Sequence, residues 1–347
     1  MTAVPKQHRA AQVKQKDGKL EIVTVDTPTP GPNEVLIKVT ASGVCGSDHM
    51  AVSGLMPGVP YPMTPGHEVV GKIVSLGKNV DRNLWNDGTK VGIGWNGGTC
   101  QHCANCRQGD PTGCQNSKVT GILKDGGHQE YVVADETALV RLPDKPNMTD
   151  AELAPLLCAG NTVHEALLVS DAKPGDLVIV QGLGGLGHLA LQYARAMGFE
   201  VVALTGTPGK ADLAKKLGAH HVFAASEDDI AAEVKKLGGA KAAIATAPSG
   251  KAAQELIPLL SRYGTLVVVG APFDGKPIEV SIMDLLGRRT VRGMTCGHAP
   301  ENEKTAKWSS LSGIKAMVNT FPLDKAHDAY EETQTGKPQF RNVIVFD

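Results

Sequence analysis

The second half of the chain alternates short apolar runs with stretches whose apolar residues recur every three or four positions. The runs are four to six residues long, as in LVIV (177–180), HVFA (221–224) and TLVVVG (265–270). Short apolar runs predict buried strands, whereas the spacing of three to four residues predicts amphipathic helices. Because parallel strands need helical crossovers, this alternation predicts an α/β fold with a doubly wound parallel sheet.

The pattern also predicts the approximate bounds of these elements. We expect strands at 177–180, 200–204, 221–224, 242–247, 265–270 and 290–294, and helices after residue 186 and at 210–217, 228–237 and 254–260. In the first of these helices, the apolar residues Leu186, Leu189, Ala190, Tyr193, Ala194 and Met197 fall on one face. That face should pack on the sheet.

Residues 1 to about 155 follow a different pattern, in which strand-like runs are separated by Pro and Gly. The runs are EIVTV (21–25), VLIKV (35–39), VVGKIV (69–74), TKVGIG (89–94) and QEYVVA (129–134). Helical periodicity is weak here, so we expect a mostly β domain. After residue 297, helical pieces precede a last strand, NVIVF (342–346).

A glycine motif lies between the first strand and the first helix of the α/β half. Gly182, Gly184 and Gly187 form G-x-G-x-x-G. Glycines at this spacing allow a tight turn, a close approach of the backbone to a pyrophosphate, and close packing of helix on strand. The unpaired N–H groups at the helix start then face the phosphates. Alone, the motif would equally describe a flexible loop, but within a strand-turn-helix unit it predicts a Rossmann-type dinucleotide site.

Composition narrows the class of protein. The chain has 347 residues, of which 41% are hydrophobic and 20% charged, with a formal net charge of −1. These values are typical of a globular protein of about two domains. The net charge near zero provides no excess of positive charge that would attract nucleic acid. No apolar run approaches the ~20 residues of a membrane span, and no apolar segment follows the basic residues near the N-terminus. We therefore expect no nucleic-acid or membrane partner and a cytoplasmic location.

Four of the seven cysteines fall within fifteen positions. Cys100, Cys103, Cys106 and Cys114 form C-x2-C-x2-C-x7-C in a Gly-containing segment. A reducing cytosol and an odd cysteine count disfavour disulfides. Four thiolates can instead enclose one Zn²⁺ tetrahedrally, and such a closed site has a structural role. The alternative is a chance cluster of unliganded thiols.

Two more cysteines and a histidine suggest a second metal site. Cys45 follows a predicted strand, His67 precedes another, and Cys158 lies in an apolar stretch. Two Cys and one His are the protein ligands of one type of catalytic zinc site, in which the fourth position is open. Each residue alone has an ordinary interpretation, and an isolated Cys158 would be read as core packing.

Taken together, these motifs resemble those of a known family. GVCGSD (43–48), GHEVVG (66–71), the four-cysteine lobe, CAGNTVHEAL (158–167) and GLGGLG (182–187) occur in the order of the zinc-dependent alcohol dehydrogenases of the medium-chain dehydrogenase/reductase superfamily. The resemblance covers the whole chain and is closest to the yeast-type and bacterial or fungal branch. It implies a GroES-like catalytic domain (1–155), a Rossmann NAD(P)-binding domain (156–296) and a C-terminal segment (297–347) that completes the catalytic domain. It also implies two zinc ions per subunit.

The resemblance assigns roles at the catalytic zinc. Its protein ligands fall on Cys45, His67 and Cys158, with Glu68 as a carboxylate that enters the coordination sphere transiently, Asp48 as the group that orients the ligand histidine, and Ser47 as the hydroxyl that receives the alcohol proton. Ser47 and Trp95 match positions in the substrate pocket. For Trp95, an ordinary core aromatic is the other interpretation.

The resemblance also implies a set of cofactor contacts. We expect them at Thr162, Gly182, Gly184, Gly185, Leu186, Gly187, Thr205, Lys210 and Arg341, the last matching an arginine that contacts pyrophosphate. Two positions depart from the family pattern. Met50 stands where many members have the histidine of a proton relay, with His49 one place earlier, and Gly46 stands where many have a His or Arg on the pyrophosphate.

The end of the second strand in this domain bears on coenzyme choice. NAD-specific domains place Asp or Glu about 20 residues past the glycine motif to bind the ribose hydroxyls. Here the segment is Thr205, Gly206 and Thr207, followed by Lys210. Hydroxyls, space and a cation suit a 2′-phosphate, so we expect NADP(H) to be preferred over NAD(H). The alternative is a relaxed NAD site that has lost its acid.

We therefore expect a zinc-dependent oxidoreductase that interconverts primary alcohols and aldehydes by hydride transfer to or from NAD(P). The alternatives are an NADPH-dependent aldehyde reductase or aromatic (cinnamyl-type) alcohol dehydrogenase, and a non-catalytic protein that binds zinc and nucleotide. The complete Cys45, His67 and Cys158 set with Ser47 disfavours the last. The expected partners are a small-molecule alcohol or aldehyde and further copies of the chain, as a homodimer or homotetramer paired through the edge strand 290–294.

Overall fold

The computed structural model describes residues 4–144, 147–206, 208–224, 229–270, 276–336 and 340–347. The chain divides into two compact units, one of residues 1–161 with 297–347 and the other of residues 162–296. The sequence placed this boundary after residue 155, so residues 156–161 lie in the first unit. None of the helices in the described ranges is long and apolar enough to cross a membrane.

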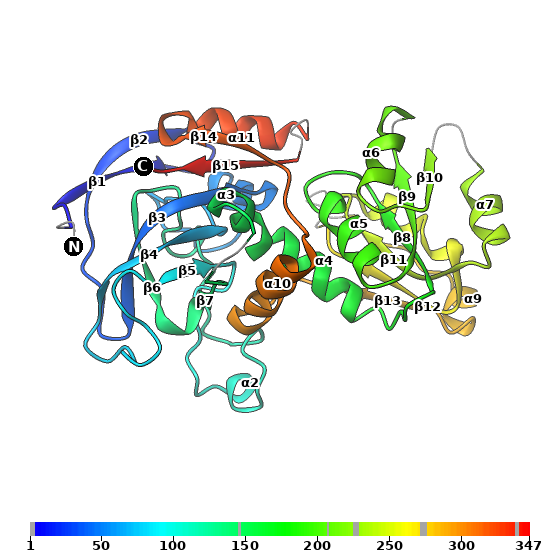
Figure 1. Cartoon of the computed structure of the whole chain (residues 1–347), viewed down its shortest axis with the longest axis horizontal. Coiled ribbons are helices and arrows are strands. Elements are labelled where there is room, and N and C mark those ends of the chain that lie inside the picture. Colours follow the sequence, from blue (N-terminus) through cyan, green and yellow to red (C-terminus); the bar gives the residue numbers. More distant parts are fainter. Residues whose placement is uncertain (1–3, 145–146, 207, 225–228, 271–275, 337–339) are drawn as a thin grey trace. The chain divides into compact units, whose positions relative to one another are not determined.

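The unit of residues 162–296 is built on a six-stranded parallel sheet (Figure 1). Its strands are β8 (Leu177–Gln181), β9 (Glu200–Thr205), β10 (His221–Ala224), β11 (Ala240–Ala245), β12 (Leu260–Val268) and β13 (Thr290–Gly293). They lie in the order β10-β9-β8-β11-β12-β13. Counted from β8, this is the order 3-2-1-4-5-6 of Rossmann domains. The predicted doubly wound sheet is confirmed.

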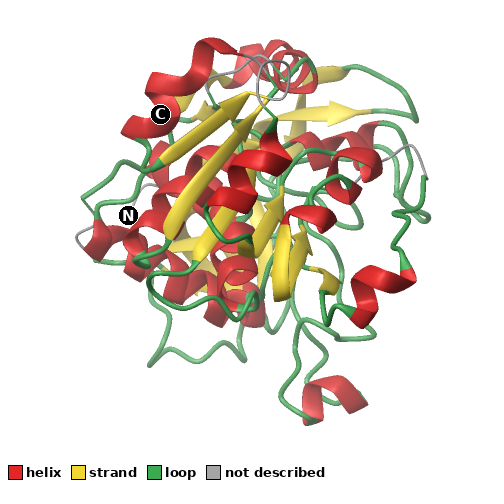
Figure 2. Cartoon of the chain, turned by 90° about the vertical axis from the view of Figure 1, so that its right-hand side faces the viewer, coloured by secondary structure: helices red, strands yellow, loops and turns green. Residues whose placement is uncertain are grey.

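Short helices connect these strands. They are α4 (Ala159–Leu168), which spans the unit boundary, α5 (Gly187–Ala196), α6 (Ala211–Lys216), α7 (Ile230–Lys236), α8 (Gly250–Gln254) and α9 (Ile282–Leu286), with 3₁₀ turns η4 (Pro208–Lys210) and η5 (Ile257–Leu259). Figure 2 shows the helices and strands of the chain coloured by type. The predicted face of α5 is confirmed, because Leu189, Ala190, Tyr193 and Ala194 are all fully buried.

One predicted boundary in this unit is wrong. The sequence pattern predicts a helix over 254–260 and a strand that begins at residue 265, but α8 ends at Gln254 and β12 begins at Leu260. Pro258 lies between them in the turn η5. Proline lacks the N–H that a continuing helix would need and clashes with the preceding turn, so the helical pattern cannot extend through it.

The first unit is mostly β, as predicted. Its strands are β1 (Gln7–Val13), β2 (Leu20–Asp26), β3 (Glu34–Val44), β4 (Val69–Leu76), β5 (Lys90–Ile93), β6 (Tyr131–Asp135), β7 (Leu139–Arg141), β14 (Val318–Pro322) and β15 (Arg341–Val345). β1 and β2 form a hairpin, and the rest form one sheet in the order β14-β15-β3-β4-β5-β7, with β6 also paired to β3. Two buried apolar clusters pack against this sheet. The sequence pattern does not predict β1, β7 or β14.

Helices in this unit are short apart from two near the C-terminus. They are η1 (Gly46–Asp48), α1 (His49–Val52), α2 (Ala104–Arg107), η2 (Glu136–Ala138), α3 (Asp150–Leu153), η3 (Ala154–Leu157), α10 (Ala299–Ser312), η6 (Leu323–Lys325) and α11 (Ala326–Gln334). The small helix α2 lies in a long loop that leaves the sheet (Figure 1). This loop holds the four-cysteine motif.

Candidate metal and nucleotide sites

The topology of the first unit gathers distant residues at one edge of its sheet. β3 is antiparallel to both β4 and β15, with Ser42 opposite Val69 and Val44 opposite Asn342. The end of β3 therefore lies beside the start of the other two strands. Residues that follow β3, precede β4 or begin β15 meet there, and these are the residues predicted to form the catalytic site.

Four potential metal ligands converge at this edge. Cys45, His67, Glu68 and Cys158 each offer an atom, and these atoms all lie within 4.8 Å of one another. Cys45 follows β3, whereas His67 and Glu68 precede β4. Cys158 ends the turn η3, where its backbone φ of −132° and ψ of −74° interrupts the helical path before α4. The structure thus brings together the three predicted ligands and Glu68.

The donor set fits a zinc ion. His67 is fully buried, and its Nε2 has no hydrogen-bond partner among the described residues. A buried imidazole nitrogen without a partner is costly unless a cation or a donor completes it. Two cysteine sulfurs and one imidazole nitrogen are ligands that zinc prefers, and three protein ligands leave one position for another molecule.

Asp48 occupies the position predicted for the group that orients His67. Its Oδ1 lies 3.0 Å from His67 Nδ1, and its Oδ2 accepts a hydrogen bond of 2.9 Å from the backbone N–H of Cys45. Burial would raise the pKa of Asp48, but His67 and His128 outweigh it and hold the pKa well below its usual range. The carboxylate is therefore ionised and favours a proton on Nδ1 of His67, which leaves Nε2 free to bind a metal.

Glu68 pairs with Arg341 behind the ligands. Glu68 is fully buried, and its Oε1 accepts from the guanidinium of Arg341, the first residue of β15. A side chain at Gly43 would collide with this carboxylate, so the glycine of GVCGSD makes room for it. Burial raises the pKa of Glu68 to about 7 despite the arginine. Sequence reasoning assigned Arg341 to pyrophosphate and did not find this ion pair, since 273 positions separate the two residues.

The pKa directions of the ligands show that the site favours a cation. Contact with Cys158 lowers the pKa of Cys45 well below its usual value, and Arg341 and His67 add to this effect. Burial would lower the pKa of His67, but Asp48 and Cys45 raise it well above its usual value. Negative charge thus gathers around the imidazole, and a bound metal ion would take the place of its proton.

Three further side chains surround these ligands. The ring of Trp95 contacts the ring of His67 edge-on, with centroids 5.0 Å apart. Ser47 lies in η1 between Cys45 and Asp48, and its hydroxyl makes no hydrogen bond to the described residues. Nδ1 of His49 lies 2.7 Å from the hydroxyl of Tyr330 in α11. This contact with Tyr330 was not expected from the sequence.

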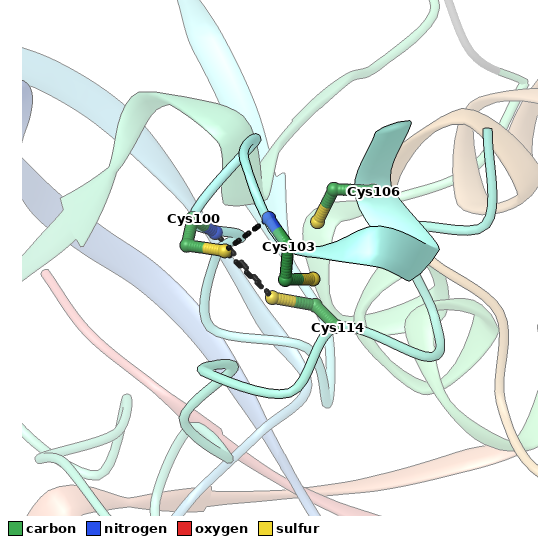
Figure 3. A group of neighbouring side chains, drawn as sticks. All are labelled: Cys100, Cys103, Cys106 and Cys114. Atoms are coloured by element: carbon green, nitrogen blue, oxygen red, sulfur yellow. Dashed lines mark hydrogen bonds between the residues drawn. The ribbon is translucent and has the colours of Figure 1, made fainter. Parts of the chain in front are cut away.

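The four-cysteine motif forms a second cluster in the loop around α2. The sulfurs of Cys100, Cys103, Cys106 and Cys114 all lie within 4.8 Å of one another and point toward a common centre (Figure 3). Sγ of Cys100 and Sγ of Cys114 are 3.7 Å apart. This distance is far beyond a disulfide bond of ~2.05 Å, and it matches the edge of a zinc–sulfur tetrahedron, about 3.8 Å for bonds of ~2.3 Å.

Hydrogen bonds donated to the cysteine sulfurs favour negatively charged thiolates in this cluster, and thiolates bind a cation. The backbone N–H groups of Cys103 and Cys100 donate to the sulfurs of Cys100 and Cys114, both at 3.4 Å. A hydrogen bond from Asn116 is the main reason that the pKa of Cys100 falls to about 5. Loss of hydration raises the pKa of Cys106 to about 12. Thiols crowded together cannot all ionise without a compensating cation. These features fit the predicted structural zinc.

The glycine turn of the second unit has the geometry predicted for a dinucleotide site. Gly182 has a φ of +88°, and a β-carbon at Gly187 would overlap the carbonyl oxygen of Gly182, so neither position accepts another residue without strain. A β-carbon at Gly184 would meet no atom within 4 Å. Gly185 and Leu186 follow and lead directly into α5, where the N–H groups of His188 and Leu189 donate to the carbonyls of Gly184 and Leu186, so that the positive end of the helix dipole is what favours an anion at this turn.

The residues predicted to set coenzyme preference lie next to this turn. Thr205 ends β9 and is buried, whereas Gly206 is exposed. Thr207 lies outside the described residues. The ammonium of Lys210 donates to the carbonyl of Leu183 at 3.4 Å, which places a positive charge at the glycine turn. Thr162, another predicted contact, is buried near the start of α4.

Comparison with known proteins identifies related families. Residues 31–144 match the family of alcohol dehydrogenase GroES-like domains, and residues 185–311 match the zinc-binding dehydrogenases. The chain is 38% identical to alcohol dehydrogenase patD of Penicillium expansum, over 99% of both chains. It is 39% identical to an alcohol dehydrogenase of Moraxella sp. (strain TAE123), over 97% of this chain and 99% of the relative.

Solved structures agree with these relatives. A cinnamyl alcohol dehydrogenase from Sorghum bicolor superimposes with a TM-score of 0.87 at 29% identity, over 98% of both chains. CAD from Helicobacter pylori complexed with NADP(H) gives 0.85 at 28% identity, again over 98% of both chains. Acetophenone reductase from Geotrichum candidum in complex with NAD gives 0.85 at 26% identity, over 99% of this chain and 98% of the other.

Proposed function

Because the chain belongs to the zinc-type medium-chain alcohol dehydrogenases, we propose that it interconverts primary alcohols and aldehydes at the site of Cys45, His67 and Cys158. The observation that carries this proposal is Nε2 of His67, a buried nitrogen that lies beside two cysteines and has no hydrogen-bond partner in the described part of the chain. A zinc ion bound there would supply a Lewis acid that lowers the pKa of an alcohol.

The residues of the chain then hold and orient the reactants. Asp48 keeps the proton on Nδ1 of His67, so that Nε2 can bind the metal. Arg341 holds Glu68 behind the site and compensates its buried charge. The edge of Trp95 beside His67 provides an apolar wall for the carbon chain of the substrate. A second zinc ion would be structural and would be held by Cys100, Cys103, Cys106 and Cys114.

Proton transfer begins at Ser47 in this proposal. Its hydroxyl can receive the proton of the alcohol and release its own. Met50 cannot carry a proton, so the onward step falls to His49 or to water. The hydrogen bond between Nδ1 of His49 and the hydroxyl of Tyr330 holds the imidazole of His49 in place.

We expect the coenzyme to bind at the glycine turn with NADP(H) preferred. Two features support this preference. Thr205 stands where an NAD-specific domain would place a carboxylate, and the Lys210 ammonium lies beside the glycine turn. A nicotinamide coenzyme bound there would supply the hydride chemistry, and the glycine turn and Lys210 would hold it.

An aromatic aldehyde reductase is the second candidate. The aromatic contact of Trp95 with His67 favours it, since a flat indole beside the metal site suits a flat substrate. A preference for NADPH would agree with work in the reducing direction. The two candidates share every residue role above and differ in substrate and direction.

Assembly as a homodimer or homotetramer completes the proposal. β13 is the last strand of its sheet and pairs only with β12 among the described strands. The short helix α9, which precedes β13 in the chain, exposes Ile282, Met283 and Leu286 by 66 to 71%. An open strand edge with apolar neighbours favours pairing with a second copy.

A substrate panel tests this function. Ethanol, hexanol, benzyl alcohol and cinnamyl alcohol would be assayed with NADP⁺ and NAD⁺, and the matching aldehydes with NADPH and NADH, by nicotinamide absorbance. The main proposal predicts turnover of primary alcohols in both directions, and the second candidate predicts that cinnamyl and benzyl substrates dominate. Absence of turnover with every pair would contradict both.

A further inference from the structure

A second buried histidine faces the carboxylate that orients the ligand His67. His128 is fully buried, and its Nε2 lies 3.4 Å from Oδ2 of Asp48. Its other nitrogen, Nδ1, shares a hydrogen bond of 2.9 Å with the hydroxyl of Ser42 in β3. Ser42, His128, Asp48 and His67 thus form a continuous buried chain of polar side chains that ends at the metal site.

The backbone fixes His128 on the loop that carries His67. The N–H of Gly127 donates to Gly66 at 2.8 Å, the N–H of His128 donates to Pro65 at 3.0 Å, and the N–H of Ala11 donates to the carbonyl of His128 at 2.8 Å. The N–H and C=O groups of His128 are therefore both satisfied. This pairing fixes the backbone of His128, and the hydrogen bond of its Nδ1 with Ser42 holds the ring.

Glycines make the space that the imidazole occupies. A β-carbon at Gly66 would lie 2.5 to 2.9 Å from the His128 ring and from the hydroxyl of Ser42. Gly66 has a φ of +105°, which a side chain would strain in any case. Gly66 immediately precedes His67, so the ring of His128 packs directly against the backbone that positions this ligand.

The arrangement is satisfied by one tautomer of His128. If the hydroxyl of Ser42 donates to Nδ1, then the neutral imidazole carries its proton on Nε2, which faces Asp48. The backbone N–H of Cys45 donates to this carboxylate, and Nδ1 of His67 and Nε2 of His128 face it at 3.0 and 3.4 Å without meeting the geometry of a hydrogen bond. The donor from Cys45 belongs to the same turn as Asp48, so His128 is the support that fixes the carboxylate from a distant part of the chain.

We infer that His128 is a positioning residue for the metal site, which holds the Asp48 carboxylate so that it faces Nδ1 of His67. This inference rests on the function proposed above. Removing the support would let the carboxylate turn away from His67, and the imidazole would lose the partner that orients its Nε2. Residues that orient a metal ligand typically contribute 10 to 100-fold in metal affinity.

The rate of zinc loss to a chromogenic chelator tests this inference. The wild-type protein is expected to release its two zinc ions in two phases, and the phase that the Cys158→Ser variant lacks belongs to the Cys45, His67 and Cys158 site. His128→Phe should accelerate that phase about tenfold, the lower end of the effect of such supports, and leave the other phase unchanged. His128→Gln keeps an N–H donor and should restore most of the wild-type rate.

His8→Phe is the matched control. His8 is also a buried histidine of this unit, with Nε2 bonded to Gln129 at 3.0 Å and Nδ1 to Thr27 at 3.2 Å, but it does not contact Asp48. Its variant should lose stability without changing either phase of zinc release. If His128→Phe does not fold, Ser42→Ala decides the question, because it keeps the imidazole but removes its other hydrogen bond and should accelerate the same phase by a smaller factor.

The contradicting outcomes are separable. A wild-type rate in the assigned phase of His128→Phe, or equal acceleration of both phases in it and in His8→Phe, would overturn the inference and leave the proposed function intact. For a non-folding His128→Phe, an unchanged phase in Ser42→Ala would do the same. If the wild-type protein has no phase that Cys158→Ser removes, the proposed metal site fails and the inference fails with it.

Discussion

Arg341 illustrates how a single side chain can serve more than one group. Its guanidinium pairs with the buried Glu68, while its Nε has no partner among the described residues. Guanidinium carries five N–H donors, so the pairing with Glu68 does not use all of them. The pyrophosphate contact implied by the family resemblance therefore stays a prediction that is compatible with the ion pair.

Thr205 allows a direct test of coenzyme preference. Thr205→Asp would place a carboxylate at the end of β9, where it would repel a 2′-phosphate and bind the ribose hydroxyls of NAD. We expect the ratio of kcat/KM for NADP to kcat/KM for NAD to fall at least about tenfold, which is ~1.4 kcal/mol of differential transition-state binding. Steady-state kinetics with both coenzymes would measure it.

Thr205→Asn is the control for that change, because it has nearly the same shape as the aspartate and no charge. Its effect on the ratio should be much smaller. Equal shifts in the two variants would show that shape rather than charge decides, and a wild-type preference for NADH over NADPH would refute the predicted preference without affecting the metal sites.

Lys124 predicts a pH dependence of stability. It is half-buried, and burial lowers the pKa of its ammonium despite nearby acidic residues. The charged ammonium is therefore disfavoured in the folded state and destabilises it at pH 7. This destabilisation disappears as the pH rises from the lowered pKa of the folded state toward 10.5, the ordinary pKa of lysine, because the ammonium then loses its proton. Lys124→Met should raise the melting temperature at pH 7 by roughly 2 °C, with a gain that shrinks by pH 10.

Thermal melts of Lys124→Met at pH 7 and pH 10 would decide this prediction. The exposed Lys118 offers a control, because Lys118→Met removes a solvated charge and should leave the melting temperature nearly unchanged at both pH values. A gain that grows with pH would have the wrong sign and would contradict the assignment.

Sequence could predict the ligands together with Asp48 and Glu68, but not the side chains that contact them from distant parts of the chain. Cys45, His67 and the glycines lie in short motifs, each with a local signature that a reader of one sequence can recognise. His128 and Tyr330 have no such signature, and each meets its partner only through the fold, 86 positions from Ser42 and 281 positions from His49. Their roles depend on strand register and loop pairing, which periodicity does not specify.

At the scale of elements, the α/β half was the more predictable. Its strands are buried on both faces and its helices are amphipathic, so both give clear patterns. In the mostly β unit, β1 begins with three polar residues and β7 has only three residues, so neither gives a clear run of apolar residues. At α8, the pattern failed because Pro258 ended a sequence that otherwise reads as helical.

The four-cysteine loop makes a prediction at the same scale. It contains only the four-residue helix α2, and Cys103 is the one buried cysteine of its four. A bound metal would therefore supply most of its folding energy. Cys103→Ala should lose one zinc ion per chain and lower the melting temperature by roughly 5–10 °C.

Cys296→Ala is the matched control, since Cys296 is buried in the second unit and lies outside both cysteine clusters. It should keep the full zinc content, as measured by mass spectrometry of the metal. Unchanged zinc content and stability in Cys103→Ala would show that the loop does not depend on a metal.

At the scale of the whole molecule, α9 and β13 predict self-association. Met283 and Leu286 expose 71% and 66% of their surface in the helix that precedes the edge strand β13 in the chain. The wild-type chain should be a dimer or tetramer at micromolar concentration by light scattering. Replacing both residues by Glu should raise the dissociation constant at least about a hundredfold, because two charges would be buried without partners.

Leu311→Glu provides the control for that variant. Leu311 is 77% exposed, but it lies in α10 of the other unit. Its replacement should leave the mass unchanged. A monomeric wild-type protein, or equal effects of the two variants, would contradict pairing through this edge.

The most direct test of the central claim couples metal content to turnover in one variant. Cys158→Ser removes one predicted ligand of the open site and leaves the four-cysteine cluster intact. We predict two zinc ions per chain in the wild type and one in the variant, with alcohol-dependent reduction of NADP⁺ abolished and the melting temperature nearly unchanged. Turnover at the wild-type rate by Cys158→Ser, or an equal zinc content in the two proteins, would contradict the assignment of Cys45, His67 and Cys158 as the catalytic metal site.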